Sequence, residues 1–295
     1  MYSFKSIQYL ILSLFISICT GQLNVNAKTS PPATFPQRIV SLGPINTENV
    51  FLLGAGKRIV GNTVYCVRPE AAKKTPKVGS VMKFSLEKLI SLQPDLILAT
   101  GLTQPLQLQQ LQRLGLPVVQ FDQPASFSQS CAQLVKLGQI LGLESRAIQI
   151  VKKMQQKVTR LQEQVASLDK PKVFLQIGSN PLHGAIGNTF SDDYISFSGA
   201  INITRGQQSG KTSREKVLAD NPDVIIIAIM GSETGIAAKE KSDWQHFSSI
   251  NAVKNGRVNV ISPDLACSPS PATFVEALQI ICSFIHPELK LETIF

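Results

Sequence analysis

The sequence is poor in the residues from which catalytic and metal sites are commonly built. Its 295 residues include three histidines, five cysteines and one tryptophan. No Cys-x-x-Cys pair is present, so no local zinc or redox motif is written. The pattern Gly-x-Ser-x-Gly is missing, and "GAGKR" (54–58) lacks the upstream glycine and the Ser or Thr of a phosphate-binding loop. We therefore expect neither a serine hydrolase nor a nucleotide-binding enzyme, and we predict a protein without enzymatic activity.

Long apolar runs are confined to the N-terminus. A basic residue precedes "YLILSLFISI" (9–18), and a polar stretch then ends at Ala27. This order is typical of a secretory signal peptide, which we place at residues 1–27. Cys19 offers a lipid anchor as the alternative, which the bulky residue before it disfavours. The later run "DVIIIAIMG" (223–231) has the length of a buried strand, so we expect an exported protein without a membrane span.

The positive charge is dispersed along the chain. The formal net charge is +9, but no basic helix interleaved with aromatic residues is present. Nucleic-acid binding usually needs a basic face or stripe. We therefore expect a solvated basic surface and no nucleic-acid partner.

Strands and helices alternate through most of the chain, which favours parallel β-α units. The pattern is interrupted from 128 to 168, where apolar residues recur every three or four positions as in a helix. We predict an α/β fold with two Rossmann-like lobes joined by one long α-helix. The predicted parts are an N-terminal lobe (35–140), a linking helix (141–169) and a C-terminal lobe (170–295).

One unit occurs twice: "SLEKLISLQPDLILAT" (85–100) and "SREKVLADNPDVIIIA" (213–228). A second motif follows each copy, "GLPVVQFD" (115–122) and "GRVNVISPD" (256–264). Two motifs repeated in the same order indicate two lobes of similar topology.

Each copy of the repeated unit begins as a capped helix would. Ser85 and Ser213 are placed to cap, and Glu87 and Glu215 fall in the first helical turn. A carboxylate there interacts favourably with the helix dipole, worth ~0.3–1 kcal/mol. Capping alone can explain both glutamates.

Long segments resemble the class III substrate-binding proteins of ABC importers, which serve cobalamin, ferric-siderophore and haem uptake. The resemblance covers about residues 38–288, and its nearest likeness is to the cobalamin-binding member. The segments that carry it are "RIVSLGPINTENVFLLGAGKRIVGNTVYC", "KVGSVMKFSLEKLISLQPDLILA", "VFLQIGSNP", "TSREKVLADNPDVIII" and "NGRVNVISPDLACSPSPATFVEAL".

The resemblance implies a periplasmic carrier that captures a metal chelate (a corrinoid, ferric siderophore or haem). The carrier delivers the chelate to a permease dimer driven by a cytoplasmic ATPase. The resemblance also implies that Glu87 and Glu215 each form a salt bridge to one permease subunit. We expect a monomer with no resident cofactor, the chelate being cargo.

The ligand of such a protein lies between the lobes, at the carboxyl ends of parallel strands. The predicted cleft residues are Pro44, Tyr65, Cys66, Val81, Thr100, His183, Asp264, Cys267 and Ser268. Tyr65 and Asp264 match cleft residues of the cobalamin-binding member. Val81 and Thr100 stand where that protein has tryptophans, and Ser268 stands where it has an arginine.

The nature of the cargo rests on few residues. An anionic siderophore would want clustered arginines, and Arg68 and Arg205 are the only clear candidates. Cys66, His183 and Cys267 fall in three predicted cleft loops, where thiolate and imidazole together suit a soft or borderline metal. The alternatives are ordinary loop residues or a disulfide.

Two other functions stay open. An exported enzyme acting on tetrapyrroles would need an acid and a base in the cleft, which only His183 and Asp264 offer. A carrier of free metal ions would need several histidines and carboxylates, which the three scattered histidines disfavour.

Overall fold

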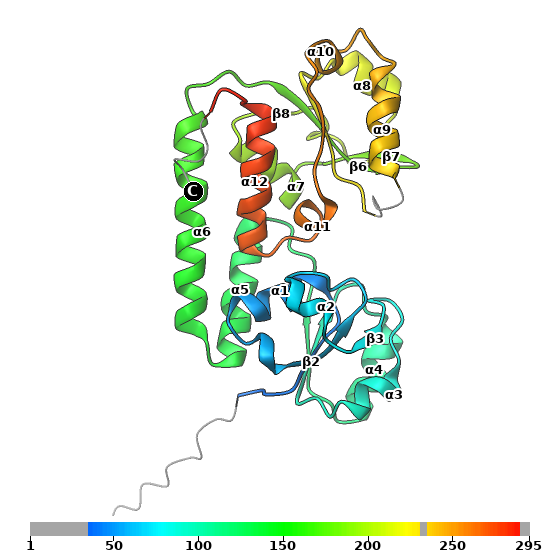
Figure 1. Cartoon of the computed structure of the whole chain (residues 1–295), viewed down its shortest axis with the longest axis vertical. Coiled ribbons are helices and arrows are strands. Elements are labelled where there is room, and N and C mark those ends of the chain that lie inside the picture. Colours follow the sequence, from blue (N-terminus) through cyan, green and yellow to red (C-terminus); the bar gives the residue numbers. More distant parts are fainter. Residues whose placement is uncertain (1–34, 231–234, 290–295) are drawn as a thin grey trace, which may run out of the picture. The chain divides into compact units, whose positions relative to one another are not determined.

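The structure, a computed structural model, describes residues 35–230 and 235–289 (Figure 1). The predicted signal peptide and Cys19 lie outside these ranges. The strands are β1 Ile39–Ser41, β2 Ile59–Thr63, β3 Lys77–Gly79, β4 Leu96–Thr100, β5 Val118–Phe121, β6 Lys172–Ser179, β7 Leu182–Gly184, β8 Ile201–Asn202, β9 Val224–Ile227 and β10 Val258–Val260. The helices are α1 Pro44–Leu52, the 3-10 turn η1 Gly56–Arg58, α2 Glu70–Lys73, α3 Leu86–Ser91, α4 Pro105–Arg113, α5 Phe127–Leu141, α6 Glu144–Val165, α7 Phe190–Phe197, α8 Arg214–Asp220, α9 Ile236–Gln245, α10 Asn251–Lys254, α11 Pro263–Ala266 and α12 Pro271–Ile285.

The N-terminal lobe is built on a fully parallel five-stranded sheet in the order β3-β2-β1-β4-β5. Successive residues of a strand point to opposite faces. Leu96 and Leu98 of β4 accordingly join the core with α1 and α5, whereas Ile97 joins the core with α3 and α4. Helices thus cover both faces, which explains why the strands read as unbroken apolar runs.

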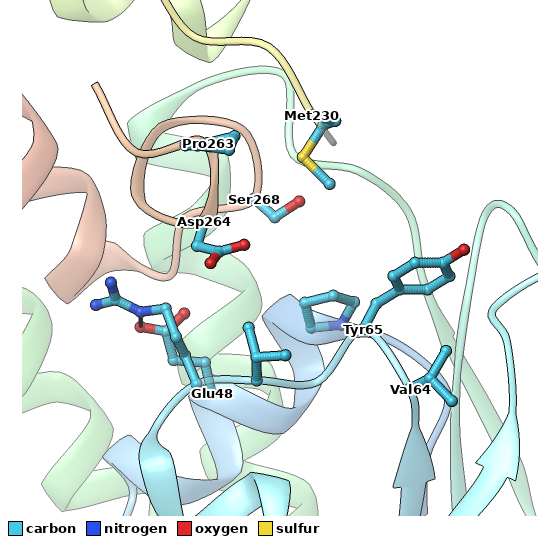
Figure 2. Close-up of a pocket in the computed structure, with 10 residues that line it drawn as sticks. Glu48, Val64, Tyr65, Met230, Pro263, Asp264 and Ser268 are labelled. Atoms are coloured by element: carbon cyan, nitrogen blue, oxygen red, sulfur yellow. Dashed lines mark ion pairs between the residues drawn. The ribbon is translucent and has the colours of Figure 1, made fainter. Parts of the chain in front are cut away.

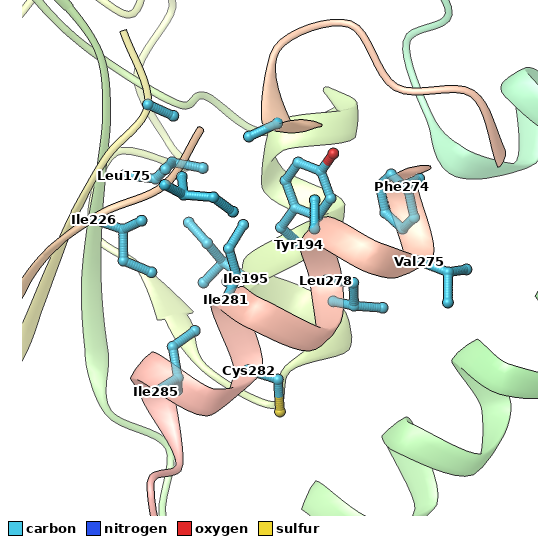
Figure 3. Close-up of a cluster of buried hydrophobic side chains, with 14 of the residues drawn as sticks. Leu175, Tyr194, Ile195, Ile226, Phe274, Val275, Leu278, Ile281, Cys282 and Ile285 are labelled. Carbon is cyan, nitrogen blue, oxygen red and sulfur yellow. The ribbon is translucent and has the colours of Figure 1, made fainter. Parts of the chain in front are cut away.

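The C-terminal lobe is built on a second sheet in the order β10-β9-β6-β7, with β8 also paired to β6. Ile226 packs with α7 and α12 on one face, while Ile225 packs with α8 and α9 on the other. Figure 3 shows the first of these cores, in which the rings of Tyr194 and Phe274 stack at 4.4 Å. The prediction of parallel α/β lobes is confirmed, except that β7 runs antiparallel to β6.

The predicted long linking helix is present as α6, and a second helix, α5, also reaches both cores. Helix α6 lies within the predicted linker, with Ala147 in the N-terminal core and Val158 in the C-terminal core. Helix α5 does the same, because Phe127 joins the C-terminal core and Leu137 the N-terminal one. Helix α12 runs beside α6 and also contacts α5 (Figure 1).

The helix caps predicted in the repeated unit are confirmed. The hydroxyl of Ser85 accepts a hydrogen bond from the backbone N–H of Lys88 at 3.3 Å, and Ser213 does the same for Lys216 at 3.3 Å. Each cap satisfies one of the N–H groups that a helix start leaves without a partner.

The repeated Pro-Asp also has one structural role in both lobes. Asp95 accepts backbone hydrogen bonds from Gln37 at 2.7 Å and Arg38 at 2.8 Å, just before β1. Asp223 accepts one from Lys172 at 2.9 Å, at the start of β6. Each aspartate therefore fixes the beginning of its lobe's first strand. No helix in the described ranges is long and apolar enough to cross a membrane.

Candidate functional site: a cleft between two α/β lobes

The main candidate site is a cavity of about 800 Å³ that both lobes line (Figure 2). Its lining residues are Pro44, Glu48, Val64, Tyr65, Val67 and Arg68 from the N-terminal lobe, and Met230, Pro263, Asp264 and Ser268 from the C-terminal lobe. These segments follow β1, β2, β9 and β10 in the chain. The cavity therefore lies at the carboxyl edges of parallel strands, where open α/β sheets bind ligands.

A second cavity of about 350 Å³ adjoins the first, because Pro44 and Ser268 line both. Its other walls include Thr100 and Asp122, which lie at the ends of β4 and β5. Together the two cavities use the carboxyl ends of most strands in the N-terminal sheet. We call this joined space the cleft.

Large apolar side chains stand exposed around the cleft. Tyr65 is 56% exposed, Met230 53% and Val64 48%. Figure 2 shows Tyr65 and Met230 facing the same space from opposite lobes. Apolar groups held open at the mouth of a cavity offer contact area to a large ligand.

Six of the nine predicted cleft residues line the cleft. They are Pro44, Tyr65, Val81, Thr100, Asp264 and Ser268. Arg68 lines it too, whereas Arg205 pairs with Asp192 at 3.3 Å and is absent from the walls of both cavities. The two candidate arginines therefore do not cluster in the cleft.

The predicted metal ligands Cys66, His183 and Cys267 do not come together. Cys66 is wholly buried, and its sulfur lies 3.1 Å from the hydroxyl of Thr47. The ring of His183 lies in β7, with Nδ1 2.9 Å from the carbonyl oxygen of Pro181. Within the described ranges, no three His, Cys, Asp or Glu side chains are grouped to hold a metal ion. In the described part of the chain these three residues therefore do not form one shared site.

Cys267 is hydrogen-bonded within its own lobe, and no disulfide joins the described cysteines. The Cys267 thiol donates to the carbonyl oxygen of Ala228 at 3.5 Å, and burial raises its pKa to about 12. A thiol this basic stays protonated at neutral pH. The described cysteines, Cys66, Cys131, Cys267 and Cys282, are all unpaired.

A charged cluster at one side of the cleft was only partly anticipated. Arg68 lies 3.9 Å from Glu48 of α1 and 3.1 Å from Glu276 of α12, so it connects the two lobes. Burial raises the pKa of Glu48 to about 7, although Arg68 and the hydroxyls of Thr273 and Ser270 oppose the rise. The sequence signal was weak, because Arg68 and Glu276 are 208 positions apart.

The two glutamates of the repeated unit are exposed at the first turns of α3 and α8. The hydroxyl of Ser213 hydrogen-bonds to Glu215 and lowers the pKa of its carboxyl. Helix α3 leads into β4 and helix α8 leads into β9, so the two glutamates occupy equivalent places in the two lobes that enclose the cleft. Neither lines it.

Fold and cleft together define a two-lobed binding protein with its ligand site between the lobes. The chain belongs to the periplasmic binding protein family, whose model matches residues 39–265. It is 31% identical over 261 residues to an uncharacterized ABC transporter substrate-binding lipoprotein, YvrC, of Bacillus subtilis, covering 86% of this chain and 81% of that one.

Two further relatives have named ligands. A vitamin B12-binding protein of Yersinia pseudotuberculosis is 33% identical over 200 residues, covering 67% of this chain and 71% of its own. The solved structure of a periplasmic heme binding protein from Pseudomonas aeruginosa matches with a TM-score of 0.78 at 27% identity, covering 87% of this chain and 95% of that one. The family resemblance inferred from the sequence is confirmed.

Proposed function

We propose that this protein is the substrate-binding component of an ABC importer, which captures a metal chelate and delivers it to a membrane permease. The observation that carries the proposal is the cleft lined from both lobes at the carboxyl edges of their strands. Relatives with this fold include proteins named for vitamin B12 and for heme. The exposed apolar residues at the cleft mouth suit a large, partly apolar chelate.

Delivery in this proposal uses one anchor on each lobe. Glu87 and Glu215 are exposed and lie at equivalent helix starts. Neither is among the residues that line the cleft. A two-lobed carrier that meets a two-subunit permease needs one contact for each subunit. Charge pairs of this kind mainly steer and register a transient complex.

The proposed location is outside the cytoplasmic membrane. Residues 1–27 have the order of a signal peptide, and the family is that of periplasmic binding proteins. The Bacillus subtilis relative is a lipoprotein, so anchoring through Cys19 is the competing arrangement. Mass spectrometry of the exported protein separates cleavage after Ala27 from a lipid-modified Cys19.

The ligand class is tested by titrating the protein from Phe35 onward with cobinamide, cyanocobalamin, haemin and ferric siderophores, following visible absorbance. We expect one class to bind at one molecule per chain. Binding of a bare divalent ion with no chelate bound would contradict the proposal.

The docking role is tested by reversing both charges in Glu87→Lys/Glu215→Lys. We expect unchanged ligand affinity and loss of transporter-dependent uptake, with Glu163→Lys on the exposed side of α6 as the matched control. Loss of ligand binding in the double variant would place these residues in ligand capture and contradict docking.

A further inference from the structure

The cleft has an uneven distribution of charge. Its two cavities are lined by three carboxylates, Glu48, Asp122 and Asp264, and by one basic residue, Arg68. A third cavity shares Val67, Arg68 and Asp264 with the first and adds the neighbouring residues Glu70 and Lys73. A ligand can interact freely only with those charged groups that are not already ion-paired.

Both cations are already occupied by carboxylates. Arg68 Nη2 lies 3.1 Å from Glu276 and its Nε lies 3.9 Å from Glu48. Lys73 Nζ lies 2.8 Å from Glu70, one turn away on α2. An anionic ligand would have to displace these carboxylates before either cation could neutralise it, and it would then leave them unpaired beside it.

Two carboxylates of the cleft have no such partner. Asp264 and Asp122 are exposed on different lobes: Asp264 follows β10 and lines the first cavity, and Asp122 follows β5 and lines the second. Within the described ranges, neither lies within ion-pair distance of a lysine, arginine or histidine. Asp122 accepts a hydrogen bond from Gln120 at 2.9 Å, which leaves its charge in place.

Glu48 is the third carboxyl group of the cleft and lines the first cavity. Its side chain is only 12% exposed, and burial raises its pKa to about 7, which favours the neutral form over that of an ordinary glutamate. Neutral Glu48 weakens the hold on Arg68 but leaves the closer Glu276 in place. In either form Glu48 brings no positive charge to the ligand.

We propose that the cleft selects neutral or cationic chelates and rejects anionic ones, with Asp264 and Asp122 as the residues that set this preference. The inference rests on the proposed chelate-binding function and narrows it. It favours corrinoids and hydroxamate-type ferric chelates over tris-catecholate ferric chelates and haem, whose carboxylates or phenolates carry negative charge. The apolar walls provide contact area, and the two aspartates make the electrostatic potential of the cleft negative.

The test compares ferric chelates of similar size and different charge. The probes are ferrioxamine B, a cationic hydroxamate; ferrichrome, a neutral hydroxamate; and ferric enterobactin, an anionic catecholate. Diaquocobinamide and haemin extend the series to a cationic and an anionic macrocycle. Dissociation constants are measured by equilibrium dialysis at low and high sodium chloride.

We expect ferrioxamine B and ferrichrome to bind at least 100-fold more tightly than ferric enterobactin, and diaquocobinamide at least 100-fold more tightly than haemin. Added salt should weaken cation binding, because exposed carboxylates are screened. Tightest binding of ferric enterobactin or haemin, or equal affinity across the charges, would overturn the inference while leaving chelate capture intact. Failure of every probe to bind would overturn the proposed function, and this inference with it.

Substitutions assign the preference to residues. Asp264→Asn and Asp122→Asn should each lower the ratio of cation to anion affinity about tenfold, a change of about 1.4 kcal/mol. Glu276→Gln should raise affinity for the anionic probes, because it removes the closer partner of Arg68. Glu163→Gln, an exposed position on α6, is the control and should leave every ratio unchanged. Unchanged ratios in both aspartate variants would overturn the assignment.

Discussion

The two copies of the repeated unit are locally alike but anchored differently. Both begin with a serine cap, and both pass through a left-handed residue before Pro-Asp, Gln93 at φ 47° and Asn221 at φ 46°. The second position differs, being Leu86 in one copy and Arg214 in the other. That single difference connects α8, and not α3, to a buried polar network.

The network lies beneath α8. Arg214 lies 2.7 Å from Glu240, which accepts from Gln176 at 2.8 Å, and the indole N–H of Trp244 donates to Gln176 at 2.7 Å. The Arg214 guanidinium also stands 4.5 Å from the Trp244 ring centre. By contrast, α3 is held through apolar contacts such as Leu89. Similar short sequences therefore acquire different stability from their surroundings.

The lobes also differ where they meet the cleft. After β1 the chain enters α1, which carries Glu48 to the cavity floor. After β6 the chain instead folds back as antiparallel β7. The N-terminal lobe thus supplies a buried carboxyl, and the C-terminal lobe supplies the hydroxyls of Ser270 and Thr273 that bond to it.

The largest expected effect concerns this carboxyl. The pKa of Glu48 is raised from 4.5 to about 7, so the folded state favours its protonated form. The resulting destabilisation is absent below about pH 4.5, grows as the pH rises toward 7 and is complete above it, where it reaches about 3 kcal/mol. Glu48→Gln removes this titration, so its advantage over the natural protein in free energy of unfolding should grow across that window.

Urea unfolding of both proteins at pH 5 and pH 8 measures the effect. All other titrating groups are shared, so they largely cancel in the difference between the two proteins. A difference that stays constant between the two pH values would show that Glu48 titrates normally.

An exchange of residues between the repeated units should give the next largest effect. Arg214→Leu leaves Glu240, 8% exposed, without its cation and should cost about 2–3 kcal/mol of unfolding free energy. The reciprocal Leu86→Arg places a charge at a half-exposed helix start and should cost less than about 1 kcal/mol. Equal losses of unfolding free energy in the two variants, measured by denaturant unfolding, would contradict the difference in anchoring between α8 and α3.

The smallest expected effect concerns the serine caps, which the two repeated units have in common. Ser85→Ala and Ser213→Ala each remove one cap hydrogen bond of 3.3 Å. Each should lower the free energy of unfolding by about 1 kcal/mol. Chemical denaturation of the two variants should agree closely, and a loss confined to one of them would mean that the caps are not equivalent.

The sequence predicted what depends on local pattern. The two lobes, the repeated unit and its caps follow from short-range periodicity, and all are present. Strand β3 was not predicted, because Pro76 before it and Gly79 at its end are typical of a loop. The predicted N-terminal lobe contains nearly all of α5, whose amphipathic pattern does not reveal that its two ends pack in different cores.

The candidate site was predicted less well, for a physical reason. Loops at one edge of a sheet can be anticipated from topology, so residues such as Tyr65 and Asp264 were found. The direction of each side chain depends on tertiary packing, and Cys66 turns inward to Thr47 rather than into the cleft. The bond between Arg68 and Glu276 likewise needs both lobes in place.

The most direct test of chelate capture in the cleft uses Ser268, which lines both cavities. Ser268→Trp places a large ring where the two cavities join, and the half-exposed position gives it room without disturbing either core. We expect the natural protein to bind its chelate at one molecule per chain in equilibrium dialysis, and the variant to lose at least 100-fold in affinity with an unchanged unfolding midpoint. Undiminished binding by a folded Ser268→Trp protein would place the ligand elsewhere and contradict the proposed site.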